Sequence, residues 1–189
     1  MLNLSARSQL YIGLALAILM AMTRGSHFDA VNLPSASWAV FFLAGVLLQP
    51  RWAFPALFLL ASVLDFIAVG WQGVGGYCMS PAYWMLIPAY GSLWLGGRLY
   101  SQLHFEHPAS LAGLAGSAAS SAFVCYLFSG GGYLYLSGRY PDPSLSQLGE
   151  RIATYYPSHL GNLMLYVGIA AVLYAGLHAA ALLRQDARA

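Results

Sequence analysis

The segment GVGGYCMSPAY, residues 73–83, contains Cys78, which is one of only two cysteines in the chain. Its glycines and its proline are typical of a loop, and loops on a rigid scaffold often carry binding groups. A free thiol in such a loop is a soft metal ligand or, as a thiolate, a nucleophile. The alternatives are a disulfide with Cys125 and simple packing as a small hydrophobic residue.

Other chemistry would need further groups beside this thiol. Nucleophilic catalysis by Cys78 would require a histidine base and a group that orients it. His27 and His159 are candidate bases, but nothing in the sequence places either one near Cys78. The two cysteines and five histidines also lack the spacing of a zinc site. The glycines at 130–132 predict a turn and not a phosphate-binding loop.

The composition indicates a membrane protein. Hydrophobic residues make up 59% of the 189 residues and charged residues only 7%, with a mean hydropathy of +0.63. Soluble domains carry roughly 25% charged residues. A single soluble core could not hide so much apolar surface. The lipid bilayer is therefore the expected partner, and no nucleic-acid partner is expected.

Six segments are apolar enough to form helices across a bilayer core about 30 Å thick. The first segment follows Arg7 and lacks the small-residue cleavage site of a signal peptide, so we expect it to be a retained helix. The expected fold is an all-α integral membrane protein, with a single transmembrane domain over residues 1–189. The six segments lie near 8–22, 38–48 (extended upstream from about residue 33), 52–69, 82–97, 109–128 and 160–183.

The longest connection between these segments is expected at about 129–158. In its second half, 145–155, apolar residues recur at a helical spacing, and Arg151 falls elsewhere on the helical wheel. This pattern predicts a short surface helix in the last outer loop, lying on one face of the membrane.

The arginines predict the orientation, because the chain contains no lysine. With six spans, the side that holds both termini collects five arginines and the opposite side collects three. The positive-inside rule therefore favours both termini in the cytoplasm. The five are Arg7, Arg51, Arg98, Arg184 and Arg188, and the three are Arg24, Arg139 and Arg151.

This topology gathers candidate binding residues at the outward-facing end. A carboxylate such as Asp65 is costly within a span, so it should face a partner or water. A structural salt bridge with Arg24 or Arg151 and contact with a ligand are both open for it. His27 could be merely solvated, and the aromatic residues could form the interfacial belt. The gathered residues are His27, Asp65, Tyr77, Cys78, Tyr83, Trp84 and Arg151.

The first predicted helix carries a stripe of small residues. Gly13, Ala17 and Ala21 recur every four residues, a spacing that lets another helix approach closely. Packing within the chain is the simpler use of this stripe, and docking of a partner is the other.

With these features the chain resembles the BtuM-type small cobalamin transporters, whose fold is related to the S-components of energy-coupling-factor vitamin transporters. The resemblance covers the whole length of the chain. It rests on six spans with cytoplasmic termini and on the loop GGYCMSPAY, whose cysteine is the hallmark of that family. Supporting positions that match are His27, Asp65, Tyr83 and Arg151.

The resemblance implies an S-component-like bundle in the bacterial inner membrane that binds cobalamin from the periplasmic side and mediates its uptake. It implies that Cys78 is an axial ligand of the corrinoid cobalt, with His27 as a second candidate ligand. The Cys78 thiolate could also remove the cyano group of cyanocobalamin. The face around Ala17 and Ala21 would dock a coupling and ATPase module. The implied binding residues are Cys78, His27, Asp65, Tyr83, Arg151, Tyr77 and Trp84.

Other classes of protein stay open from the sequence. The same fold could bind another vitamin, His27 and His159 could hold a haem, or the chain could be a membrane-embedded thiol enzyme. The visible spectrum of the purified protein separates these classes, because a corrinoid, a haem and a thiol enzyme absorb differently. The sequence contains no nucleotide-binding motif, so either a separate ATPase drives transport or the protein works alone.

Overall fold

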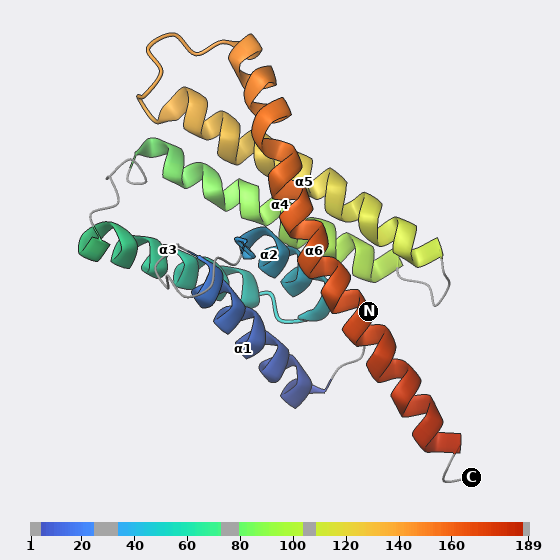
Figure 1. The fold of residues 1–189 in the computed structure, drawn as a ribbon. Helices are drawn as coiled ribbons and strands as arrows, with labels where there is room; N and C mark the ends of the chain where they lie inside the picture. The colour runs from blue at the N-terminus through green and yellow to red at the C-terminus, as the bar shows by residue number, and fades with distance from the viewer. Residues whose placement is uncertain (1–4, 25–33, 73–79, 104–108, 187–189) are drawn as a thin grey trace.

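The computed structural model describes residues 5–24, 34–72, 80–103 and 109–186. Every regular element within these ranges is helical (Figure 1), which confirms the expected all-α class. The elements are α1 (Ala6–Thr23), α2 (Ser37–Leu47), α3 (Ala53–Gln72), the 3₁₀ helix η2 (Pro81–Met85), α4 (Leu86–Leu103), α5 (Ala109–Leu136) and α6 (Leu145–Asp186).

Four of these helices, α1, α3, α5 and α6, are long and apolar enough to cross a membrane. They leave many large apolar side chains exposed, such as Leu14, Leu59 and Val172, which lipid would cover. The other two expected spans are shorter or less apolar. The 11 residues of α2 rise only about 16 Å, and α4 has 18 residues but a more polar composition.

The short helix α2 lies at the centre of the bundle and contacts α1, α3, α4 and α6. Its residues Ala39, Val40, Phe41 and Phe42 are completely buried. This helix is therefore apolar all round because protein, and not lipid, surrounds it.

Hydrogen bonds at both ends align α2 antiparallel to α1. The amide of Ala36, just before α2, donates to Thr23 Oγ1 at 3.1 Å. The amide of Gln49, just after α2, donates to Gln9 Oε1 at 3.1 Å. With its flanking residues, α2 therefore runs beside α1 from Thr23 back to Gln9, although the helix itself is short.

Two glycines let α2 and α4 cross at backbone distance. A Cβ atom on Gly45 would overlap the carbonyl oxygen of Trp94, and one on Gly97 would overlap the carbonyl oxygen of Phe42. Close approach through small residues is a common way for membrane helices to pack. Next to this crossing, Arg98 Nη1 donates to the carbonyl oxygens of residues 48 and 49, at 3.0 and 2.9 Å.

The glycines at 130–132 lie inside α5, so the prediction of a turn there is wrong. Their small size has a packing reason. A Cβ atom on Gly132 would come within 2.6 Å of Met85 Cγ in η2, and one on Gly130 would come within 2.8 Å of the Tyr126 ring. The glycines therefore allow α5 to extend to Leu136 while η2 packs directly against it.

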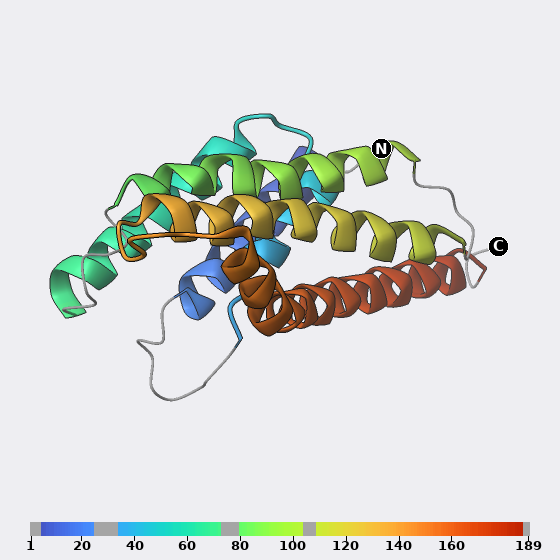
Figure 2. The same ribbon diagram turned by 90° about the horizontal axis from the view of Figure 1, so that it is seen from above.

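Residues 145–155 are helical, but they are the beginning of α6 and not a separate surface helix, so that prediction is also wrong. The helix continues through Pro157, and Figure 2 shows its first turns at an angle to the rest. A proline removes one backbone hydrogen bond and bends a helix without necessarily ending it. The connection between α5 and α6 is therefore only residues 137–144, where Gly138 has a φ of 71°.

The small-residue stripe of α1 faces the bundle. A Cβ atom on Gly13 would lie 3.9 Å from Leu48 Cδ1, and Ala17 packs against the buried core. The geometry favours the use of this stripe for packing within the chain.

The α2–α4 crossing predicts that Gly45→Ala and Gly97→Ala each lower the free energy of unfolding by about 1 to 3 kcal/mol, because the added methyl group forces the two backbones apart. Gly116→Ala on α5 is the matched control, since no atom lies within 4 Å of its Cβ position. We expect it to be neutral or slightly stabilising. Thermal unfolding in detergent measures all three, and equal stability of the three variants would contradict the close crossing.

Candidate functional site

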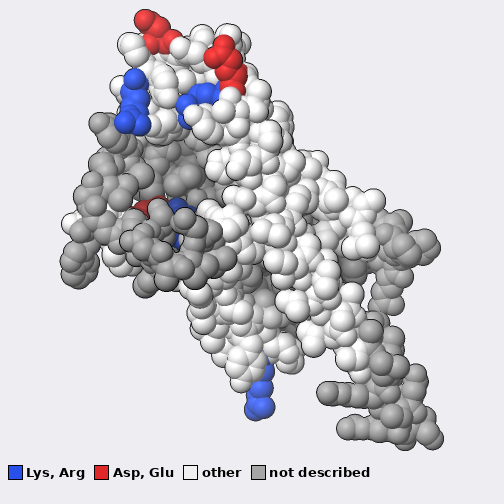
Figure 3. Space-filling model, in the orientation of Figure 1, with Lys and Arg blue, Asp and Glu red and all other residues white. Residues whose placement is uncertain are grey.

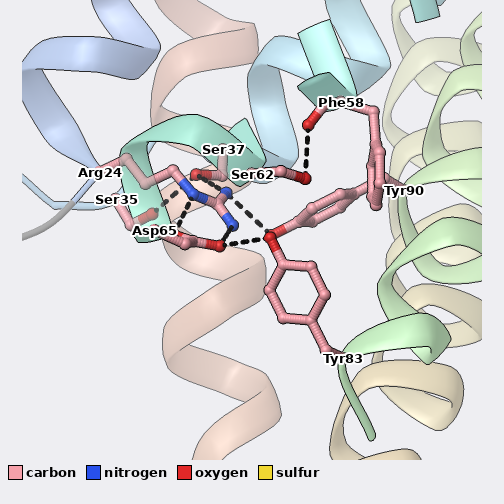
Figure 4. Close-up of polar contacts among 8 residues, drawn as sticks. All are labelled: Arg24, Ser35, Ser37, Phe58, Ser62, Asp65, Tyr83 and Tyr90. Atoms are coloured by element: carbon pink, nitrogen blue, oxygen red, sulfur yellow. Dashed lines mark hydrogen bonds and ion pairs between the residues drawn. The ribbon is translucent and has the colours of Figure 1, made fainter. Parts of the chain in front are cut away.

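A bidentate ion pair lies at the end of the bundle where α1 and α3 end (Figure 4). Arg24 is the C-terminal cap of α1, and Asp65 lies on α3. Arg24 Nε donates to Asp65 Oδ1 and Nη2 donates to Oδ2, both at 2.7 Å. Parallel bonds of this kind are among the strongest side-chain hydrogen bonds. Of the two partners proposed for Asp65, the structure therefore pairs it with Arg24.

Three more side chains extend this pair onto other elements. Arg24 Nη1 donates to Ser37 Oγ on α2 and to the Tyr90 hydroxyl oxygen on α4, both at 3.0 Å. The Tyr83 hydroxyl on η2 donates to Asp65 Oδ2, also at 3.0 Å. We call Arg24, Ser37, Asp65, Tyr83 and Tyr90 the Arg24 network. It connects α1, α2, α3, η2 and α4 at one end of the molecule.

The Arg24 network is partly shielded from solvent, with the Arg24 and Asp65 side chains 11% and 23% exposed. Burial alone would lower the pKa of Arg24, but Tyr90 and Asp65 raise it overall through charge interaction and hydrogen bonding. The guanidinium therefore stays charged and neutralises Asp65. Opposite charges at this spacing make a carboxylate tolerable in an apolar setting.

The network is attached to the apolar core through Tyr90. The Tyr90 ring stacks on Phe41 of α2, with ring centroids 4.4 Å apart and an interplanar angle of 9°. The guanidinium carbon of Arg24 lies 5.5 Å from the centre of the same tyrosine ring. Tyr90 and Ser37 were not predicted as site residues, because each lies in an apolar stretch that gives no sign of a polar partner.

Arg151 lies in a second cluster and does not join the Arg24 network. Its Nη1 atom donates to the Tyr140 hydroxyl oxygen at 2.9 Å. Its guanidinium carbon lies 5.4 Å, 5.6 Å and 5.2 Å from the ring centres of Tyr133, Tyr140 and Tyr155, respectively. We call Arg151 and these three residues the tyrosine cluster. It joins the end of α5, the following connection and the start of α6.

Charged residues collect on the surface around the tyrosine cluster. In Figure 3, acidic and basic side chains lie over the end of α5 and the start of α6, while the flanks of the bundle are almost free of charge. Asp142, Glu150 and Arg139 are exposed there, and Arg139 Nη1 donates to the Tyr133 hydroxyl oxygen at 2.6 Å.

The predicted aromatic residues differ in their exposure. Tyr83 is half-buried and contacts Phe66 with ring centroids 6.5 Å apart. Trp84 is 67% exposed, which fits both a rim of a binding site and an interfacial belt. One face of α3 has an open apolar depression of about 440 Å³, lined by Val63, Phe66, Ile67 and Gly70.

Three predicted site residues, His27, Tyr77 and Cys78, lie outside the described residues. Cys125 lies within them, is completely buried and carries a free thiol. His159 stacks on Trp38 with ring centroids 4.9 Å apart and also neighbours Tyr126. Within the described ranges, no three histidine, cysteine or acidic side chains group closely enough to hold a metal ion.

No protein-family model matches the chain, and no curated protein shows significant sequence similarity to it.

The ion pair predicts a strong coupling between Arg24 and Asp65. Asp65→Asn or Arg24→Gln alone should lower the free energy of unfolding by about 3 kcal/mol, because each leaves a part-buried charge without its partner. The double variant Arg24→Gln/Asp65→Asn should lose less than the sum of the two single losses. Chemical denaturation in detergent gives all values of this double-mutant cycle. Additive losses would show that the two side chains do not interact.

Proposed function

We propose that this chain is a small cobalamin-uptake protein of the bacterial inner membrane, with six helices crossing the bilayer and both termini in the cytoplasm. In this proposal α2 crosses the bilayer at the buried centre of the bundle, and α4 crosses beside it with Leu95 and Leu99 exposed on the surface. The ligand enters from the periplasmic side, at the end of the bundle that carries the Arg24 network. The resemblance of the GGYCMSPAY loop to that of BtuM-type transporters supports this ligand.

One observation carries the proposal. Asp65 and Tyr83 flank the segment that contains Cys78, and their side chains are hydrogen-bonded at 3.0 Å. Cys78 precedes Ser80, where the described chain resumes, by only two residues. This bond fixes the described residues on the two sides of the segment relative to each other. A metal-binding loop benefits from such support, because rigid anchors reduce the entropy lost on binding.

The chemistry proposed for Cys78 is ligand exchange at cobalt. The thiolate sulfur donates an electron pair to Co(III), and the cyano group leaves cyanocobalamin as cyanide with the electron pair of its bond. Cobalt stays in the same oxidation state, so no external reductant is needed. A thiolate is favoured because binding to a metal cation lowers the affinity of the sulfur for a proton.

The surroundings suit a large ligand that carries both apolar and amide groups. The Tyr83 hydroxyl and the Asp65 carboxylate offer hydrogen bonds, while Phe66 and Trp84 offer apolar surface. Sites for cofactors commonly combine an apolar wall with a few fixed polar groups. Two hydrogen bonds from Arg24, each 2.7 Å long, fix the position of the Asp65 carboxylate.

Substitution of Cys78 tests this function. Purified wild-type protein mixed with cyanocobalamin should change the visible spectrum of the corrinoid as a cobalt–sulfur bond replaces cobalt–cyanide. Cys78→Ala should lose this change, while some binding persists through contacts to the ring. Cys125→Ala is the matched control and should behave as wild type, because its thiol is completely buried.

The result that would contradict the proposal is an identical spectral change in wild type and Cys78→Ala. A wild-type protein that binds no corrinoid in equilibrium dialysis would overturn it as well. A Soret band in the purified protein would instead support the haem alternative.

A further inference from the structure

The Arg151 guanidinium is part-buried and has unused hydrogen-bonding capacity. Its Nε atom is buried and has no hydrogen-bond partner. Within the described residues, the guanidinium makes a single hydrogen bond, from Nη1 to the Tyr140 hydroxyl oxygen. The edge formed by Nε and Nη2 is therefore left without an acceptor. Buried N–H groups of native proteins are almost always paired, so such an edge points to a missing acceptor.

The charge of Arg151 is also not balanced by a carboxylate. Arg24 is paired with Asp65, whereas Arg151 forms no ion pair with any described residue. The exposed acidic residues of this end, Asp142 and Glu150, make no ion pair with it. The three tyrosine rings stabilise the cation through their faces, but ring faces do not replace an anionic hydrogen-bond acceptor.

Two tyrosine hydroxyls of the same cluster have protons to donate. The Tyr140 oxygen accepts a hydrogen bond from Arg151, and the Tyr133 oxygen accepts one from Arg139 at 2.6 Å. A hydroxyl that accepts from a cation keeps its own proton for another acceptor. The cluster thus combines a guanidinium edge with hydroxyl donors and contains no carboxylate.

We propose that the tyrosine cluster around Arg151 is a binding site for a phosphate group. The two parallel N–H groups of the Nε and Nη2 edge match two oxygens of a phosphate, and the tyrosine hydroxyls bind the others. The phosphate belongs to a lipid headgroup or to a soluble phosphate ester. The site lies at the end of α5 and the start of α6, where Figure 3 shows charged side chains on the surface. It does not rest on the cobalamin proposal.

The local fold allows the Arg151 side chain to be changed without loss of its turn of α6. Tyr126 on α5 donates its hydroxyl to the backbone carbonyl oxygen of Arg151 at 2.9 Å. This bond uses the backbone of residue 151, so it does not require the arginine side chain. Arg151→Gln removes the charge, and Arg151→Lys keeps the charge but removes the two parallel N–H donors of the guanidinium.

Inorganic phosphate is the first probe. Thermal unfolding of the purified protein in neutral detergent is followed as phosphate replaces chloride at constant ionic strength. Wild type should be stabilised by phosphate, and Arg151→Gln and Arg151→Lys should each bind it about tenfold more weakly or worse. Arg51→Gln is the matched control, because it removes one exposed arginine from the connection between α2 and α3. It should respond to phosphate as wild type does.

Vesicles distinguish the two sources of the phosphate. Native mass spectrometry after reconstitution in phosphatidylcholine with and without phosphatidylglycerol reports bound lipid. Phospholipid retained by wild type and lost from Arg151→Lys identifies a headgroup, whereas stabilisation by phosphate without retained lipid identifies a soluble phosphate ester. If folded wild type and Arg151→Lys respond equally to phosphate and retain equal lipid, Arg151 only packs against its tyrosines and the proposal is overturned.

Discussion

The bidentate ion pair between Arg24 and Asp65 is the interaction on which the polar end of this protein depends. Each charge alone would be costly among apolar helices. Together the two side chains make three further hydrogen bonds, with Ser37, Tyr83 and Tyr90. The hydrogen-bonded residues come from α1, α2, α3, η2 and α4, so the pair holds these five elements together at this end of the bundle. Without it, Asp65 would be an unpaired carboxylate beside Tyr83.

The position of the pair is itself a consequence of the central helix. α2 is short and mostly surrounded by protein, and its close crossing with α4 is possible because Gly45 and Gly97 lack a side chain. That crossing brings Tyr90 of α4 against Phe41 of α2, with the Tyr90 hydroxyl aimed at Arg24. The apolar packing at the centre therefore places the polar groups at the end, and the two features are parts of one arrangement.

The sequence predicted the helical class and the approximate segments because long apolar runs have few other structures in a bilayer. It failed where packing overrides local composition. The glycines at 130–132 look like a turn, but they allow α5 to pack against Met85, and Pro157 bends α6 instead of ending it. Asp65 and Tyr83 were predicted as neighbours at one end, whereas Tyr90 was missed because a tyrosine in an apolar span gives no sign of its partner. Arg151 was grouped with Asp65 and Tyr83 because the predicted topology put all three on one face. In the structure Arg151 packs in the tyrosine cluster, apart from the Arg24 network.

The central claim is that the end of the bundle built around the Arg24 network faces outward and receives the ligand. Trp84 and Trp52 offer a matched test, since both are 67% exposed and they lie at opposite ends of the helices. Intact cells that express Trp84→Cys or Trp52→Cys are treated with a membrane-impermeant maleimide, with and without cobalamin. Mass spectrometry of the peptides then distinguishes label on the new cysteine from label on Cys78. The account predicts that Trp84→Cys is labelled from outside and protected by cobalamin, while Trp52→Cys is labelled only after permeabilisation and is not protected. Labelling of Trp52→Cys from outside, or equal protection of both positions, would contradict it.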